Sequence, residues 1–159
     1  MRKLVVYFSG FGNTEKVAAR VAERTGADVC RIEPFEPYPD NLQEVMKIGR
    51  RETDGGVVRS IREPGVDFSG CDEVILGMPT WWCHMPPCIS CLLKSVHFER
   101  VHVFVTDSGL PFDIVEEMRR VSPGTQVESS IAVEFTPLVE PPSRLVTPLE
   151  EIDAWIDSL

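Results

Sequence analysis

Residues 9–14 have the types and the spacing that bind a phosphate group. The run Ser9-Gly10-Phe11-Gly12-Asn13-Thr14 follows an apolar segment and precedes a helical pattern. Hydroxyl groups, close backbone approach at the glycines and the unpaired N–H groups that open a helix would together surround a phosphate. The segment therefore predicts a ligand that carries phosphate.

Two commoner phosphate loops fit these residues less well. A Walker loop requires lysine where Asn13 stands. A dinucleotide fingerprint would use Gly10 and Gly12, with Glu33 on the ribose, but its third glycine falls on Glu15, whose charge would repel a pyrophosphate. A strand–turn–helix connection without a ligand also stays open.

A second candidate segment, residues 79–87, contains two adjacent tryptophans. Trp81 and Trp82 each carry a large apolar surface that is costly to expose to water. We expect one indole to stack on a flat ring of the ligand and the other to pack inward. Cys83 and His84 are candidates for thiol or proton chemistry beside that ring; the alternative is that they contribute only backbone groups.

The five cysteines raise the question of a metal site. Cys83-x4-Cys88-x2-Cys91 has the spacing of a plant-type iron–sulfur cluster, but no cysteine follows Cys91 as a fourth ligand, so Cys71 or Cys30 would have to serve instead. Cys88 and Cys91 also lie one helical turn apart in an apolar segment. We therefore expect most of them to be buried thiols and expect no metal. The odd count and a cytosolic context argue against a disulfide framework.

Length and charge narrow the class of protein. The 159 residues suit one domain, 1–159, and the 43% that are hydrophobic are enough for a core. A formal charge of −9 argues against nucleic acid and anionic membrane surfaces as partners. Without an apolar run long enough for a membrane span or a cleavable signal pattern, the sequence predicts a cytoplasmic protein.

Strand-like and helix-like segments alternate along the chain. The predicted strands are 3–8, 28–33, 72–78, 101–106 and 126–134, and the predicted helices are 14–25, 41–51, 88–95, 112–121 and 149–159. Residues 52–69 are predicted to form a long polar loop with a weak strand or turn. Five apolar strands separated by helices predict an α/β fold of three layers, with an open parallel sheet covered on both faces.

Ligands of such sheets bind beyond the carboxyl ends of the strands. Segments 9–14 and 79–87 each follow a predicted strand, and so does Thr106-Asp107-Ser108-Gly109. We therefore expect all three at one edge of the sheet, where they would form a single site. His97 and His102, near the fourth strand, are expected at the surface.

These motifs resemble the flavodoxin-like family, and within it a short flavodoxin-type group. That group has Tyr-Phe-Ser-x-x-Gly-Asn-Thr after its first strand and a later Pro-x-Trp-Trp loop, matched here by residues 7–14 and 79–82. The similarity runs from residue 3 to about residue 135. It implies the strand order 2-1-3-4-5 and FMN held without covalent bonds, with no catalytic side chain. The cofactor-binding residues that it implies are Ser9, Gly10, Phe11, Gly12, Asn13 and Thr14 at the phosphate, Pro79, Thr80, Trp81, Trp82, Cys83 and His84 along the ring, and Thr106, Asp107, Ser108 and Gly109 at its pyrimidine side.

The chain departs from the family pattern at two of these positions. The family usually has threonine or a small polar residue where Phe11 stands, so one hydroxyl to the phosphate is missing. Asp107 stands where serine or glycine is common. Its carboxylate would oppose the reduced, anionic flavin and so lower the potential of the last reduction step.

Three functions are compatible with the sequence. The resemblance implies a low-potential one-electron carrier whose acidic surface docks on a basic redox partner. An FMN-dependent NAD(P)H or quinone oxidoreductase, with a small quinone-like substrate and residues 52–69 as a lid, is the alternative. A flavin-free interaction domain of the same fold is the third. A phosphoacceptor signalling domain is disfavoured, because Phe8-Ser9 and Met78-Pro79 stand where it needs clustered acids.

Overall fold

The computed structural model describes all 159 residues and contains one parallel five-stranded sheet. The strands are β1 (Lys3–Tyr7), β2 (Asp28–Arg31), β3 (Glu73–Pro79), β4 (Arg100–Asp107) and β5 (Gln126–Glu134). Their order, β2-β1-β3-β4-β5, confirms the predicted sheet and strand order. The central strands are continuous apolar runs because both of their faces are buried.

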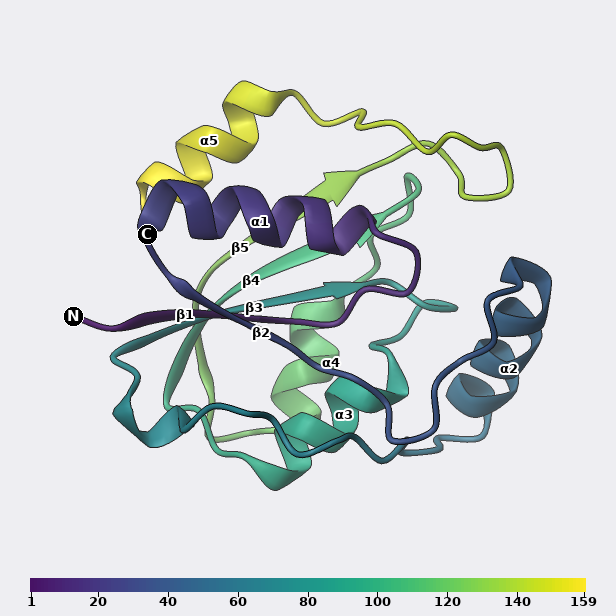
Figure 1. Ribbon diagram of the computed structural model, residues 1–159, viewed down its shortest axis with the longest axis horizontal. Coiled ribbons are helices and arrows are strands. Elements are labelled where there is room, and N and C mark those ends of the chain that lie inside the picture. Colours follow the sequence, from purple (N-terminus) through teal and green to yellow (C-terminus); the bar gives the residue numbers. More distant parts are fainter.

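Helices cover both faces of the sheet, as Figure 1 shows. On one face lie α1 (Asn13–Thr25) and α5 (Leu149–Asp157), which pack against Val5, Ile75 and Phe104. On the other lie α3 (Pro87–Ser95) and α4 (Ile114–Val121). This arrangement confirms the predicted three-layer α/β fold, and none of the helices has the length and apolar character needed to cross a bilayer.

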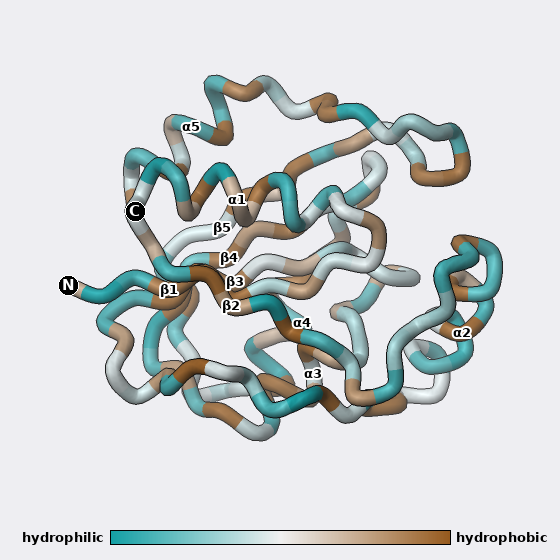
Figure 2. The backbone as a smooth tube through the Cα atoms, viewed as in Figure 1, coloured by the Kyte–Doolittle hydropathy of each residue, from teal (hydrophilic) through white to brown (hydrophobic).

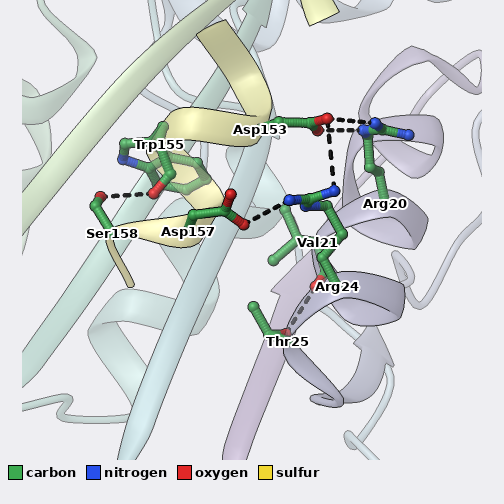
Figure 3. A network of polar contacts seen from close by, with 8 residues as sticks. All are labelled: Arg20, Val21, Arg24, Thr25, Asp153, Trp155, Asp157 and Ser158. Carbon is green, nitrogen blue, oxygen red and sulfur yellow. Dashed lines mark hydrogen bonds and ion pairs between the residues drawn. The ribbon is translucent and has the colours of Figure 1, made fainter. Parts of the chain in front are cut away.

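An ion-pair network joins α1 to α5 on the outer surface of their layer (Figure 3). The guanidinium of Arg20 donates two hydrogen bonds of 2.6 Å to the Asp153 carboxylate, and Arg24 donates one of 2.6 Å to Asp157. The hydrogen bonds from Arg20 lower the pKa of Asp153. The network lies far along the layer from the loops that end the strands.

Helix α2 (Leu42–Asp54) does not lie on the sheet but beyond the carboxyl ends of its strands (Figure 1). Only Val45, Gly49 and Glu52 are buried in it, and most of the helix is hydrophilic in Figure 2. A helix with so narrow an apolar stripe cannot cover a sheet face. Its place against the core is taken by another segment.

That segment, residues 57–72, is mainly extended and crosses the face that also carries α3 and α4. Ile61, Val66, Phe68 and Cys71 pack against the buried cluster there, and a short 3₁₀ helix, η1 (Phe68–Gly70), interrupts the segment. The predicted long loop with a weak strand or turn is confirmed over residues 55–67, where Ile61 forms an isolated bridge to Pro34, and it differs in two respects. Residues 52–54 complete α2, and the widely spaced apolar residues after them anchor the chain to the sheet.

Other helix boundaries follow capping side chains. Asp113 accepts a 3.0 Å hydrogen bond from the N–H of Glu116, so α4 begins two residues later than predicted. Asn41 caps α2 in the same way through the N–H of Glu44. Strand β2 is shorter than predicted and ends at Arg31.

The prediction that His102 lies at the surface was wrong, because the ring is mostly buried in a polar chain at the amino ends of the strands. Its Nδ1 lies 2.7 Å from Ser129 Oγ, and Ser129 Oγ accepts a 3.1 Å hydrogen bond from the Trp155 indole. The indole can only donate, whereas the Ser129 hydroxyl, with one proton and two lone pairs, can either donate to Nδ1 or accept from it. The other ring nitrogen is Nε2. That nitrogen lies 3.4 Å from Glu73, whose other oxygen is 3.3 Å from Lys3 Nζ. His97, in contrast, is exposed, as predicted.

Candidate functional site

The three segments that follow β1, β3 and β4 line one cavity of about 350 Å³ at the carboxyl edge of the sheet. It brings together most of the residues that the sequence singled out: Ser9, Gly10, Phe11, Asn13, Thr14, Pro79, Thr80, Trp81, Trp82, Cys83, Thr106, Asp107 and Ser108. Gly12, His84 and Gly109 do not line it. Three residues that sequence reasoning missed do: Leu110, Phe112 and Leu138.

The loop over residues 9–14 presents several unpaired hydrogen-bond donors. Gly12 has φ of 101°, a left-handed conformation that glycine adopts without strain, and its N–H donates to Ser9 Oγ at 3.0 Å. Other N–H groups of this loop have no acceptor within the chain: those of Ser9, Gly10, Phe11, Asn13 and Thr14. These free donors beside the positive end of α1 form a binding site for an anion.

The polar side chains of this loop hold its shape. The Thr14 hydroxyl lies 2.7 Å from that of Thr106, both buried, and so ties the loop to the end of β4. The Asn13 amide donates a 2.9 Å hydrogen bond to Ser143 Oγ, which donates in turn to the carbonyl of Thr136. An anion at this loop would therefore meet mainly backbone donors.

The tryptophan loop is a tight two-residue turn. Trp81 and His84 exchange two backbone hydrogen bonds of 2.9 Å, and the residues between them, Trp82 and Cys83, have φ of 50° and 68°. Such a turn favours glycine or asparagine, so two other residues there are strained. Trp82 is held in place by a 3.1 Å hydrogen bond from its Nε1 to the carbonyl of Met46 in α2.

The two indoles differ in burial. Trp81 packs inward, with its ring centroid 5.3 Å from that of Phe8 and 5.0 Å from that of Tyr38. Trp82 is exposed at the rim, where the Arg50 guanidinium lies 5.4 Å from its ring. Trp81 is thus the inward member of the pair, and ligand stacking on Trp82 stays a prediction.

His84 lies at a different place from the one expected. Its Nδ1 is 3.4 Å from the carboxylate of Glu117 on α4, which also accepts the N–H of Met85 at 3.1 Å. The ring lines a separate cavity of about 260 Å³ between α2, α3 and α4. Cys83 alone of the pair borders the main cavity, so proton chemistry by the His84 side chain beside a ligand there is not supported.

The other cysteines of the cluster-like spacing lie in α3. Cys88 is fully buried in the core, and this burial raises the pKa of its thiol. Cys91 is half-buried, and Cys83 is exposed at the turn. Of the five cysteines only Cys30 and Cys88 are buried, so the prediction that most of them are buried was wrong. Cys88 therefore occupies the position of a small apolar core residue.

The third loop combines a carboxylate with an apolar rim. Asp107 accepts a 2.7 Å hydrogen bond from the N–H of Gly109. Desolvation raises the pKa of Asp107, and the nearby Glu134 carboxylate adds to this. Leu110 is 69% exposed and Phe112 is 48% exposed at the mouth of the cavity. The sequence signal for Phe112 was the helix cap at Asp113, which places Phe112 in the loop instead of in α4.

A second cavity of about 380 Å³ lies on the other side of Trp81 and the 9–11 backbone. Its walls include Phe8 and Tyr38, with Arg31 and Arg62 among the charged residues at its edge. Trp81 and the first loop therefore form a partition between two cavities. The position of this one indole fixes the shape of both.

The sequence matches the model of a protein family described as Flavodoxin over residues 2–130. The chain belongs to the flavodoxin family. This membership agrees with the resemblance found in the motifs and with the sheet order. Among curated proteins no match is found.

Solved structures of other flavodoxin-family members and flavoproteins share the fold at low identity. A Bacteroides uniformis protein assigned as a flavoprotein is 21% identical, with a TM-score of 0.79 over 98% of this chain and 97% of its own. The Lactobacillus acidophilus flavoprotein in complex with FMN is 20% identical, with a TM-score of 0.71 over 82% and 92%. The Streptococcus pneumoniae flavodoxin is 16% identical, with a TM-score of 0.52 over 99% and 94%.

Proposed function

We propose that the protein binds FMN without covalent bonds in the 350 Å³ cavity and carries single electrons at low potential between redox partners. One observation carries this proposal: a single cavity has free backbone N–H donors at one end and apolar walls at the other. FMN has the same division, with an anionic phosphate at one end and a flat ring system at the other. The complex of the related Lactobacillus acidophilus protein with FMN supports the assignment.

The residues present fit this group. The N–H groups of Gly10, Phe11, Asn13 and Thr14 would receive the phosphate, without a side-chain hydroxyl at position 11. Pro79, Trp82 and Phe112 would border the ring, with Leu110 and Leu138 beside them. When bound, FMN supplies reversible uptake of electrons, and the protein supplies orientation and electrostatics.

Asp107 supports the low potential. Its carboxylate borders the cavity, and a negative charge there disfavours the reduced, anionic form of the flavin. The formal charge of −9 supports a partner with a basic docking surface, because opposite charges steer association.

An FMN-dependent NAD(P)H or quinone oxidoreductase is the second candidate. The exposed Leu110 and Phe112 at the cavity mouth favour it, because a small aromatic substrate could pack against them. The expected lid over residues 52–69 does not support it, since this region consists of the end of α2 and a segment packed on the core. A cytoplasmic location stays an expectation from the sequence.

The test is titration of the purified apoprotein with FMN, followed by absorption and by quenching of flavin fluorescence. We expect saturable binding at one site and a yellow complex. Absence of binding after complete removal of copurified ligand would contradict the proposal and favour the flavin-free interaction domain. Rapid NADPH oxidation with a quinone, without an added reductase, would favour the oxidoreductase over the carrier.

A further inference from the structure

Trp81 is packed between two stretches of backbone that lack side chains. A Cβ atom added at Gly10 would lie 3.0 Å from Trp81 Cζ2, and one added at Gly49 would lie 3.2 Å from Cε3. Gly10 belongs to the loop with free N–H donors, and Gly49 belongs to α2. The indole therefore occupies a slot whose width depends on where α2 stands.

The sheet does not fix the position of α2, so other contacts must. One is the hydrogen bond from the Trp82 indole to the carbonyl of Met46, and another is a buried carboxylate. One oxygen of Glu52 accepts a 2.8 Å hydrogen bond from the Tyr38 hydroxyl, and the other forms an ion pair with Arg59. Arg59 also donates to the carbonyl of Glu36 at 2.7 Å and 3.2 Å. Three segments of the chain meet at this one side chain.

The contact continues from the carboxylate to the indole. The link is Tyr38, whose ring contacts both Arg59 and Trp81. The Arg59 guanidinium lies 3.9 Å from the centroid of the Tyr38 ring, and the centroid of the Trp81 ring lies 5.0 Å from it. Burial, and then the hydrogen bond to Glu52, raise the pKa of Tyr38, so its hydroxyl stays a donor. Glu52 itself does not border the proposed FMN cavity.

We propose that Glu52 is a positioning residue for the flavin site: by holding Tyr38, Arg59 and α2 together, it fixes Trp81 in the partition between the two cavities. This inference rests on the proposed FMN site for its functional consequence. Its structural part, the immobilisation of Trp81, does not require FMN.

The first experiment tests that structural part in the apoprotein. Trp82→Phe and Trp155→Phe leave Trp81 as the sole tryptophan, and acrylamide quenching of its fluorescence is measured with and without Glu52→Gln. The amide lacks the negative charge that pairs with Arg59, so α2 should loosen and the quenching constant should rise at least about twofold through local opening. An unchanged quenching constant would overturn the proposal, whatever FMN does.

The second experiment measures FMN affinity with all three tryptophans present. Glu52→Gln should weaken binding about tenfold, the lower end of the range found when residues that orient the ligands of a metal ion are removed. Tyr38→Phe keeps the ring against Trp81 but loses the hydroxyl, so it should weaken binding in the same direction and by less. It is also the substitute test if Glu52→Gln does not fold.

The matched control is Arg20→Gln, which breaks the ion pair between α1 and α5 shown in Figure 3. It should lower the melting temperature and leave both quenching and FMN affinity unchanged. If Glu52→Gln behaved like this control, with lower stability and unaltered affinity, its role would be structural only and the proposal would fail. If the wild type bound no FMN while quenching still rose, the proposed function would fail and the positioning of Trp81 would stand.

Discussion

The two ends of the sheet differ in whether their polar groups have partners within the chain. At the amino ends, Trp155, Ser129, His102, Glu73 and Lys3 follow one another as partners across the sheet. At the carboxyl ends, all the backbone donors of the 9–14 loop except that of Gly12 have no acceptor in the chain. Buried polar groups are costly unless paired. The first arrangement therefore stabilises the fold through most of its members, although Glu73 Oε1 faces His102 without a hydrogen bond, and the second leaves its donors free for a ligand. Substitutions at the two ends should therefore separate stability from affinity.

The largest effect on stability is expected at the amino ends. His102→Ala would leave the Ser129 hydroxyl and the Glu73 carboxylate without their shared partner and would open a cavity. We expect a loss of about 3 kcal/mol in the free energy of unfolding, measured with denaturant, and unchanged FMN affinity. His97→Ala, at an exposed histidine, is the control. Weaker FMN binding by His102→Ala would break the separation between the two ends.

At the carboxyl ends the effect should fall on the ligand. Gly10→Val places a side chain against Trp81, and the overpacking should cost about 1–3 kcal/mol, seen mainly as FMN affinity lower by roughly one to two powers of ten. Gly65→Val has no neighbouring atom within 4 Å and should change neither property. Calorimetric titration of both variants checks this. Equal affinities would mean that the ligand does not use this loop.

A substitution at the contact between β4 and the 9–14 loop should change both stability and FMN affinity. Thr106→Val removes one member of the buried hydroxyl pair that ties β4 to the 9–14 loop. We expect about 1 kcal/mol of lost stability and an FMN affinity several-fold lower, because Thr14 loses its partner. Thr25→Val removes a hydroxyl at the far end of α1 and should affect stability alone. Titration with FMN and thermal unfolding of the two variants check this expectation.

The smallest effect concerns pH. The pKa of Asp107 is raised in the fold. At pH values just above the usual pKa of aspartate, the folded state therefore binds more protons than the unfolded state. The free energy of unfolding falls as the pH rises through that window. Asp107→Asn should remove this fall and be more stable above about pH 5, by less than about 1 kcal/mol after solvent screening. It should also raise the reduction potential of bound FMN. Thermal unfolding from pH 4 to 8 checks the first effect; a fall that persists in the variant would assign it to another group.

The parts of the site that were predictable from sequence share one cause. Segments that follow parallel strands must meet at one edge, so the union of the loops after β1, β3 and β4 needed no knowledge of side-chain packing. The resemblance to the family then gave the strand order. Both depend on strong local patterns.

What the sequence did not predict depends on competition between segments. Helix α2 and residues 57–72 could each have covered the sheet, and the choice rests on Ile61, Val66 and Phe68 against a mostly polar helix. His84 turns toward Glu117 because a carboxylate 33 residues away in sequence happens to lie beside it. Leu138 lines the cavity from a proline-rich connection whose sequence has neither helical nor strand periodicity.

Helix α2 has a kinetic consequence because it stands beyond the sheet. Its amide hydrogens can exchange with solvent through a local opening that leaves the core intact, and they should exchange before those of α1 and α3. Each opening would also release the backbone against which both indoles rest. The lifetime of the FMN complex would then follow the opening rate of one helix and not the stability of the whole fold.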